Sequence, residues 1–98
     1  MNRRALIRRR AEVEINQAVI WYEGKQIGLG REFLAEIGAT VRTIAERPES
    51  FPVDYKYARR ALARRFPYKV YFVVEPDRIE VIAVLHSSQS RSRLRGRL

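Results

Sequence analysis

The residues of this chain best suited to chemistry are one histidine and a group of closely spaced arginines. Four guanidinium groups able to clamp a phosphate come from Arg59, Arg60, Arg64 and Arg65. His86 is the only histidine in the chain and the candidate for moving a proton near neutral pH. Cleavage of RNA through its 2′-hydroxyl needs a base, an acid and cations around the phosphate, and arginine is a poor proton shuttle because it stays charged.

Each of these residues also has a purely structural interpretation. For His86 the favoured interpretation is a strand-end histidine that bonds to a loop carbonyl, and for the arginines the structural alternative is a solvated edge strand. An interaction surface is the better interpretation of the arginines, since two adjacent pairs place guanidinium groups on both faces of one strand. Of the nearby carboxylates, Glu75 borders a turn and Glu80 is expected on the same side as His86.

Two strands must hold these groups in place. Residues 69–75 and 78–86 are rich in Val, Ile, Tyr and Phe and flank Pro76-Asp77, a pattern typical of an antiparallel hairpin. Because side chains alternate between the two faces of a strand, each strand should direct one set of apolar residues to a single face. These sets are Tyr68, Val70, Phe72 and Val74 in the first strand, and Ile79, Val81, Ala83 and Leu85 in the second. Both faces carry apolar groups, so one should pack on helices and the other should be only partly open to water.

Two helices precede the hairpin. Apolar residues recur at helical spacing from Ala11 to Tyr22, about four turns, and Gly24 and Gly28 mark the exit. A second apolar stripe runs from Leu29 to Ile44, and Pro48 forbids its continuation. The short link makes the helices an antiparallel pair. Trp21 and Tyr22 are expected to pack in the core rather than to stack on bases.

The remaining segments complete the order of elements. Residues 5–10 predict a short edge strand, residues 48–54 a crossing loop, and residues 57–63 a further strand. The predicted fold is therefore α+β with the order β-α-α-β-β-β, a helical hairpin packed on a small, mainly antiparallel sheet. We expect a single domain over residues 1–98, with basic and flexible ends at 1–4 and 87–98.

Composition excludes several classes of protein. The chain has 98 residues and no cysteine, which excludes a disulfide scaffold and thiolate metal sites. The sequence has no glycine-rich phosphate loop, zinc-ligand spacing or Ser-His-Asp arrangement, so we expect no metal and no cofactor. No apolar run approaches the roughly 20 residues of a membrane span, which favours a cytoplasmic protein without a membrane partner.

Charge is strongly uneven along the chain. The net charge is +9, of which residues 1–10 contribute +5 and residues 87–98 contribute +4. Residues 11–54 carry 4 basic and 8 acidic groups, whereas residues 55–86 carry 7 basic and 3 acidic groups. The predicted helical half is thus acidic and the predicted sheet half basic. Such segregation favours an acidic partner or a nucleic acid at the sheet side, although basic termini also serve solubility.

The order and spacing of several motifs resemble the RelE/ParE superfamily, the toxin halves of bacterial toxin-antitoxin modules that are often labelled plasmid stabilisation proteins. The resemblance covers roughly residues 5–94. It rests on Trp21-Tyr22-Glu23, Gly30-x-x-Phe33, Pro48 with Phe51-Pro52, Arg60-x-Leu62-x-x-Arg65-Phe66-Pro67-Tyr68-x-Val70, and Val84-Leu85-His86. The amino-acid sequence of the last two motifs is closer to that of the ParE branch.

The resemblance implies a toxin that is neutralised by a cognate antitoxin in a hetero-oligomer, the antitoxin laying its C-terminal segment across the toxin. It also implies one of two mechanisms. ParE-like members inhibit DNA gyrase by binding and need no catalytic groups of their own. RelE-like members are metal-independent endoribonucleases that cleave mRNA on the ribosome. A third alternative is a degenerate member that is no longer toxic.

We favour the ParE-like mechanism, with gyrase as the target. No catalytic residue is assigned under it; if the chain were a nuclease, the candidates would be His86, Arg60 and Arg65. The expected contacts to target or antitoxin are Arg59, Arg60, Arg64, Arg65, Lys69, His86, Arg91 and Arg93.

Overall fold

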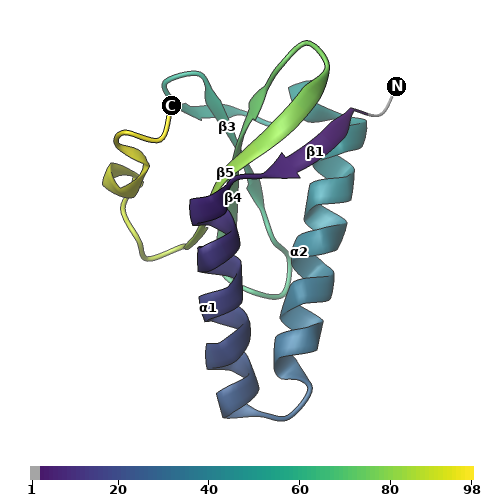
Figure 1. The fold of residues 1–98 in the computed structure, drawn as a ribbon, viewed down its shortest axis with the longest axis vertical. Helices are drawn as coiled ribbons and strands as arrows, with labels where there is room; N and C mark the ends of the chain where they lie inside the picture. The colour runs from purple at the N-terminus through teal and green to yellow at the C-terminus, as the bar shows by residue number, and fades with distance from the viewer. Residues whose placement is uncertain (1–2) are drawn as a thin grey trace.

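Two helices pack on one face of a five-stranded sheet in the computed structural model, which describes residues 3–98 (Figure 1). The elements run β1 (Arg4–Ile7), α1 (Arg9–Lys25), α2 (Leu29–Glu46), the 3₁₀ helix η1 (Pro48–Ser50), β2 (Val53–Tyr55), β3 (Ala58–Leu62), β4 (Tyr68–Val74), β5 (Arg78–His86) and the 3₁₀ helix η2 (Arg91–Leu94). The predicted α+β class and the predicted order of elements are confirmed, with β2 as an addition.

The sheet has the order β1-β5-β4-β3-β2. β1 lies parallel to β5, and the other three neighbouring pairs are antiparallel, as expected for a mainly antiparallel sheet. Both helices lie in the connection from β1 to β2, the two edge strands, and they cover the same face of the sheet. Their apolar stripes and the facing strand residues form the main core, in which Phe33 and Ile44 are fully buried.

Two predicted boundaries were wrong. Arg9 and Arg10, predicted in the first strand, begin α1, because the ladder with β5 ends where the Arg8 amide donates to the Val81 carbonyl. The predicted loop of residues 48–54 contains η1, with Pro48 in its first turn, and the start of β2. β2 returns into β3 through Lys56, whose φ of +51° makes the tight turn.

The helical hairpin turns at Gly28, which has a φ of +90°, and is closed by one carboxylate. Glu23 accepts hydrogen bonds from the backbone amides of Gly28 and Gly30, both 3.0 Å long. These two bonds favour the ionised carboxylate and lower the pKa of Glu23. The side chain thus satisfies amides at the N-terminus of α2 that have no helical partner of their own.

A β-bulge in β5 changes which residues face the helices. Tyr71 pairs with Ala83 and Phe72 with Val81, so that Ile82 is an extra residue in β5. The predicted face set was therefore wrong beyond Val81: Ala83 and Leu85 lie on the face away from the helices. The expectation that Glu80 and His86 share a side was wrong for the same reason, since one extra residue inverts the alternation.

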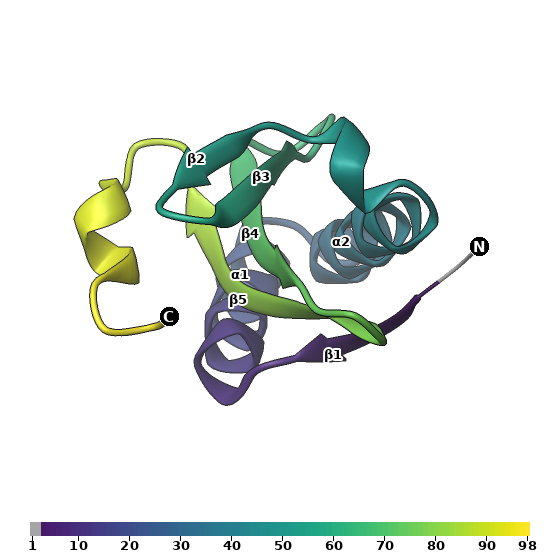
Figure 2. The same cartoon turned by 90° about the horizontal axis from the view of Figure 1, so that it is seen from above.

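The C-terminal segment, residues 87–98, covers the second face of the sheet. Figure 2 shows this segment on the opposite side of the sheet from α2. Leu94 is fully buried and joins Tyr71, Ile82 and Leu85 in a second apolar cluster, against which Leu98 packs. The segment that we expected to be flexible is thus in contact with the sheet. The expected N-terminal end, residues 1–4, lies partly outside the described residues.

Within residues 3–98, neither helix combines the length and the apolar composition that crossing a membrane requires.

Candidate functional site

The predicted binding residues are spread over five places on the molecule. His86 ends β5 on the helix-covered face, where its ring lies 5.3 Å from the ring of Tyr68. Arg60, Lys69 and Arg91 lie around Tyr71, on the face that the C-terminal segment covers. The other four predicted residues are Arg59, which faces the loop around η1, Arg64 and Arg65 in the loop between β3 and β4, and Arg93 in η2.

Local hydrogen bonds hold the ring of His86 in place. The Ser88 amide donates to His86 Nδ1 over 3.0 Å, and the Ser88 hydroxyl lies 2.8 Å from the same nitrogen. Nδ1 thus accepts a hydrogen bond from the backbone of the turn that follows β5. This arrangement agrees with a histidine that orders the strand end.

Arg59, Arg64 and Arg65 have different roles in the structure. Arg59 donates to the carbonyl of Phe51 over 2.6 Å and so holds the segment after η1. Arg65 forms an ion pair with Glu32 of α2 at 2.8 Å. Arg64 is exposed and borders a shallow hollow beside α2. Of these three, only Arg65 has a carboxylate partner among the described residues, because Arg59 is bound to backbone carbonyls and Arg64 is in no ion pair.

The loop that carries Arg64 and Arg65 is held by a carboxylate that the sequence analysis did not single out. Glu36 of α2 accepts hydrogen bonds from the backbone amides of Arg65, at 2.7 Å, and Phe66, at 3.1 Å. Phe66 inserts its ring between those of Tyr22 and Phe33. The loop therefore has a fixed position on α2.

A buried tyrosine and an aspartate organise the other face. The Tyr71 hydroxyl donates to Asp54 Oδ2 over 2.7 Å, and the Arg91 guanidinium lies 3.2 Å from Asp54 Oδ1. Lys69 reaches the carbonyl of Gln89 at 3.4 Å. Arg60 has a buried Nε with no hydrogen-bond partner among the described residues. The sequence did not mark either residue, because Tyr71 looks like an ordinary strand residue and Asp54 ends the predicted loop of residues 48–54.

Burial and the hydrogen bond to Asp54 raise the pKa of Tyr71 to about 12. Because the pKa of Tyr71 is higher in the folded than in the unfolded protein, protonated Tyr71 contributes stability. This contribution is complete below the unfolded pKa of about 10, and it disappears as pH rises toward the folded pKa. We expect the free energy of unfolding to fall between about pH 10 and pH 12, and this fall to be smaller in Tyr71→Phe. Denaturant unfolding at several pH values measures it. Tyr57→Phe, at an exposed position, is the control and should keep the wild-type profile.

The C-terminal segment is tied to the fold by an ion pair. Arg97 donates through Nη1 and Nη2 to the two carboxylate oxygens of Glu14, at 3.0 Å and 2.7 Å. Glu14 also accepts from the backbone amide of Val84, just after the bulge, at 2.9 Å. The sequence did not mark Glu14 or Arg97 as functional. It did offer one sign that residues 87–98 pack on the fold, since this Ser/Arg-rich segment contains two leucines, at 94 and 98.

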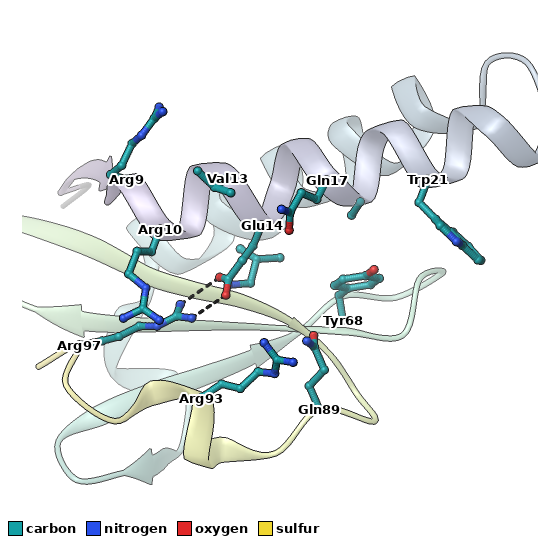
Figure 3. A pocket seen from close by; sticks show the side chains of 12 residues that line it. Arg9, Arg10, Val13, Glu14, Gln17, Trp21, Tyr68, Gln89, Arg93 and Arg97 are labelled. Carbon is teal, nitrogen blue, oxygen red and sulfur yellow. Dashed lines mark hydrogen bonds and ion pairs between the residues drawn. The ribbon is translucent and has the colours of Figure 1, made fainter.

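A groove runs between α1 and the C-terminal segment (Figure 3), with a volume of about 430 Å³. Arg10, Gln17 and Trp21 line it from α1, and Gln89 and Arg93 line it from the C-terminal segment. Arg97 and Glu14 lie at its base, joined by the ion pair, and Tyr68 lies toward the end at which Trp21 stands. Arg93 is the one predicted binding residue that the groove contains.

The prediction that Trp21 and Tyr22 both pack in the core was correct for Tyr22 and wrong for Trp21. Tyr22 does pack in the core, stacked on Phe33 at 5.3 Å between ring centroids. Trp21 is 57% exposed, and it lines the groove between α1 and the C-terminal segment near Tyr68. Lys25 lies over the indole ring at 4.7 Å.

In residues 3–98, no group of three His, Asp or Glu side chains is arranged to hold a metal ion.

No protein-family model matches the sequence. No curated protein matches it either. Among solved structures, one chain of the chromosomal ParDE TA system from P. aeruginosa has a TM-score of 0.71 with this protein at 14% sequence identity, covering 86% of this chain and 95% of that chain. The fold expected from the RelE/ParE resemblance is thereby confirmed over most of the molecule. At this identity, the comparison establishes the fold.

Proposed function

We propose that this chain is the toxin of a type II toxin-antitoxin module of the ParE kind, which inhibits DNA gyrase by binding and is neutralised by a cognate antitoxin. The observation that carries the proposal is the fold shared with a chain of the ParDE system across nearly the full length of both chains. Residues of the motifs that prompted the resemblance have defined places in this fold: Phe33 and Phe66 are part of the main core, and Val84 to His86 end β5.

The geometry of the nuclease candidates favours binding over catalysis. His86 faces the helices, whereas Arg60 lies opposite Tyr71 on the other face of the sheet. Arg65 is engaged with Glu32 of α2. An endoribonuclease needs its proton-transfer groups and its cations around one phosphate, and these three residues do not surround a common point.

The charge distribution supports a protein partner. The exposed Arg64 of the β3–β4 loop lines the same hollow as Leu62, whose side chain is 61% exposed. An acidic, amphipathic antitoxin segment would bury such apolar groups and pair with the guanidinium groups on folding. The proposal also implies a cytoplasmic location, since both gyrase and the alternative target, the ribosome, are found there.

Induced expression in a susceptible bacterium tests the proposal. DNA and protein synthesis are pulse-labelled separately within minutes of induction, with and without co-expression of the cognate antitoxin. We expect DNA synthesis to stop first, together with an induced DNA-damage response, and the antitoxin to restore growth. Early arrest of translation with mRNAs cut within codons would replace the proposal by the mRNA-interferase mechanism. No effect on either synthesis would indicate a degenerate, non-toxic protein.

The variant His86→Ala separates the two mechanisms further. Since His86 orders a turn and lies apart from Arg60, we expect the variant to inhibit growth as strongly as the wild type. The measurement is the growth curve after induction at matched protein level, with circular dichroism as the check on folding. His86→Gln, which keeps a polar side chain at the turn, is the companion variant. Loss of inhibition in both variants with the fold intact would contradict a mechanism by binding alone.

A further inference from the structure

The groove between α1 and the C-terminal segment presents two arginines from opposite walls. Arg10 is in the first turn of α1 and Arg93 is in η2, and Figure 3 shows both side chains extending into the space between the two elements. Neither has an ion pair with a carboxylate of the described residues. Two guanidinium groups facing one channel from both sides suit an anion between them.

The other charged groups of the groove largely cancel. Arg97 neutralises Glu14 through two hydrogen bonds, and Arg9 at the rim pairs with Glu12 at 3.1 Å. The remaining charge is that of Arg10 and Arg93, and it is positive. The first turn of α1 has no side-chain cap, so the partial positive charge of the helix terminus adds to it.

Aromatic surface stands at the far end of the same groove. Trp21 is more than half exposed, and the half-buried Tyr68 lies across from it. The Trp21 ring meets the Tyr22 ring edge-on at 5.0 Å between centroids, and its exposed π surface is suited to stacking on a flat ring. Lys25, above the indole, adds a further positive charge at this end.

The spacing along α1 aligns these features. Arg10, Gln17 and Trp21 lie on one face of the helix, and the 11 residues from the first to the last span about 16 Å. Gln17 and Gln89, whose amides both donate and accept hydrogen bonds, stand between the arginines and the indole. The groove is therefore a short channel with cations at one end, amides in the middle and an aromatic ring at the other end.

We propose that this groove binds a short stretch of single-stranded nucleic acid, with backbone phosphates between Arg10 and Arg93 and a base stacked on Trp21. Proteins that hold single strands combine a positive groove that follows the backbone with aromatic side chains that stack on bases. An acidic peptide would use the two arginines but leave the indole and the Gln17 amide without partners. A duplex keeps its bases stacked on one another, so it would use only the arginines.

The first measurement uses the single tryptophan of the chain. Because Trp21 is the only one, its fluorescence reports on this groove alone. Full-length protein is titrated with oligothymidylate and oligouridylate of about 12 nucleotides, a length within the range of known single-strand sites. We expect saturable quenching of the indole by both probes, and no comparable quenching by a DNA duplex of equal length or by poly-glutamate.

Matched double variants test the role of the arginines. In Arg10→Ala/Arg93→Ala we expect binding, measured by anisotropy of a labelled oligonucleotide, to weaken about tenfold, with the slope of log affinity against log salt reduced by about 1.4 for two lost phosphate contacts. Arg31→Ala/Arg42→Ala removes the same charge from exposed positions of α2 that do not line the groove. This control should stay within about twofold of the wild type.

Three results would overturn the proposal. Equal weakening in the two double variants would mean that binding follows net charge alone. Duplex binding as tight as single-strand binding, or displacement of the oligonucleotide by poly-glutamate at equal charge, would assign the groove to any polyanion. We expect Trp21→Leu to bind the oligonucleotide about tenfold more weakly, and unchanged affinity in this variant would exclude the stacking contact. Since the binding is measured on the isolated chain, its failure leaves the toxin proposal untouched, and the reverse holds as well.

Discussion

Replacing Glu14 by alanine is expected to lower the free energy of unfolding by about 3 kcal/mol. The Glu14 carboxylate binds Arg97 through two oxygens and also accepts from the Val84 amide. The Arg97 side chain is only 5% exposed, so removal of Glu14 leaves a positive charge in a place that water hardly reaches. Loss of one partner of such a pair costs more than the pair contributes, because the other charge stays buried and uncompensated.

Chemical denaturation with the matched variant Glu12→Ala measures this effect. Glu12 is on the same turn of α1 but exposed, and its ion pair with Arg9 is worth about 0.5 kcal/mol or less. The variant Glu14→Ala/Arg97→Leu should recover part of the loss, since it buries no unpaired charge. Tryptic cleavage at Arg91, Arg93 or Arg95 should be faster in Glu14→Ala, because the C-terminal segment loses its tie to α1. Equal stability of the Glu14 and Glu12 variants would show that the pair does not hold the segment.

The variants Gly30→Ala and Gly38→Ala are expected to change stability in opposite directions, although both glycines lie in α2. A Cβ on Gly30 would stand 2.7 Å from the Val19 carbonyl oxygen, a backbone atom of α1. That oxygen is part of the helix and cannot move without stretching its hydrogen bonds, so the two helices must separate. We expect a loss of about 2 kcal/mol in the free energy of unfolding.

Gly38 offers the matched comparison. The nearest atom to a Cβ there is Arg42 Nη1 at 3.6 Å, the end of a flexible side chain. Alanine should therefore fit and stabilise the helix by about 0.5 to 1 kcal/mol, through the lower backbone entropy of the unfolded chain. Thermal and denaturant unfolding of both variants measures the difference. A stabilising effect of Gly30→Ala would mean that the helices do not approach one another this closely.

Local patterns were enough for most of the fold. The apolar stripe from Leu29 to Ile44 predicted α2. Pro48 predicted its end, and the helix does end nearby, at Glu46. Pro76-Asp77 predicted the turn between β4 and β5. In these cases the cause of the structure lies within a few residues of its effect: a helical period, a missing amide or a preferred turn conformation. The RelE/ParE resemblance added a fold, which the comparison with the ParDE chain confirms.

The candidate site was predictable only in part, because contacts between distant segments decide it. The sequence supplied Arg93 as a binding residue but not Arg10 or the exposure of Trp21, which depend on where the C-terminal segment and α2 pack against α1. It predicted arginines on both faces of β3, but not that Arg59 would be used by the loop around η1.

The sequence by itself determined the two helices, the β4–β5 hairpin, the helix-covered sheet and the concentration of positive charge at both ends of the chain. Only the tertiary structure decided the bulge at Ile82, which moves Ala83 and Leu85 away from the helices. It also decided the cover that the C-terminal segment places on the second face of the sheet. The physical reason is that periodicity records how a residue relates to its neighbours in the chain. A bulge depends on the partner strand, and the position of the C-terminal segment depends on a carboxylate 83 residues away in sequence, Glu14, that binds Arg97.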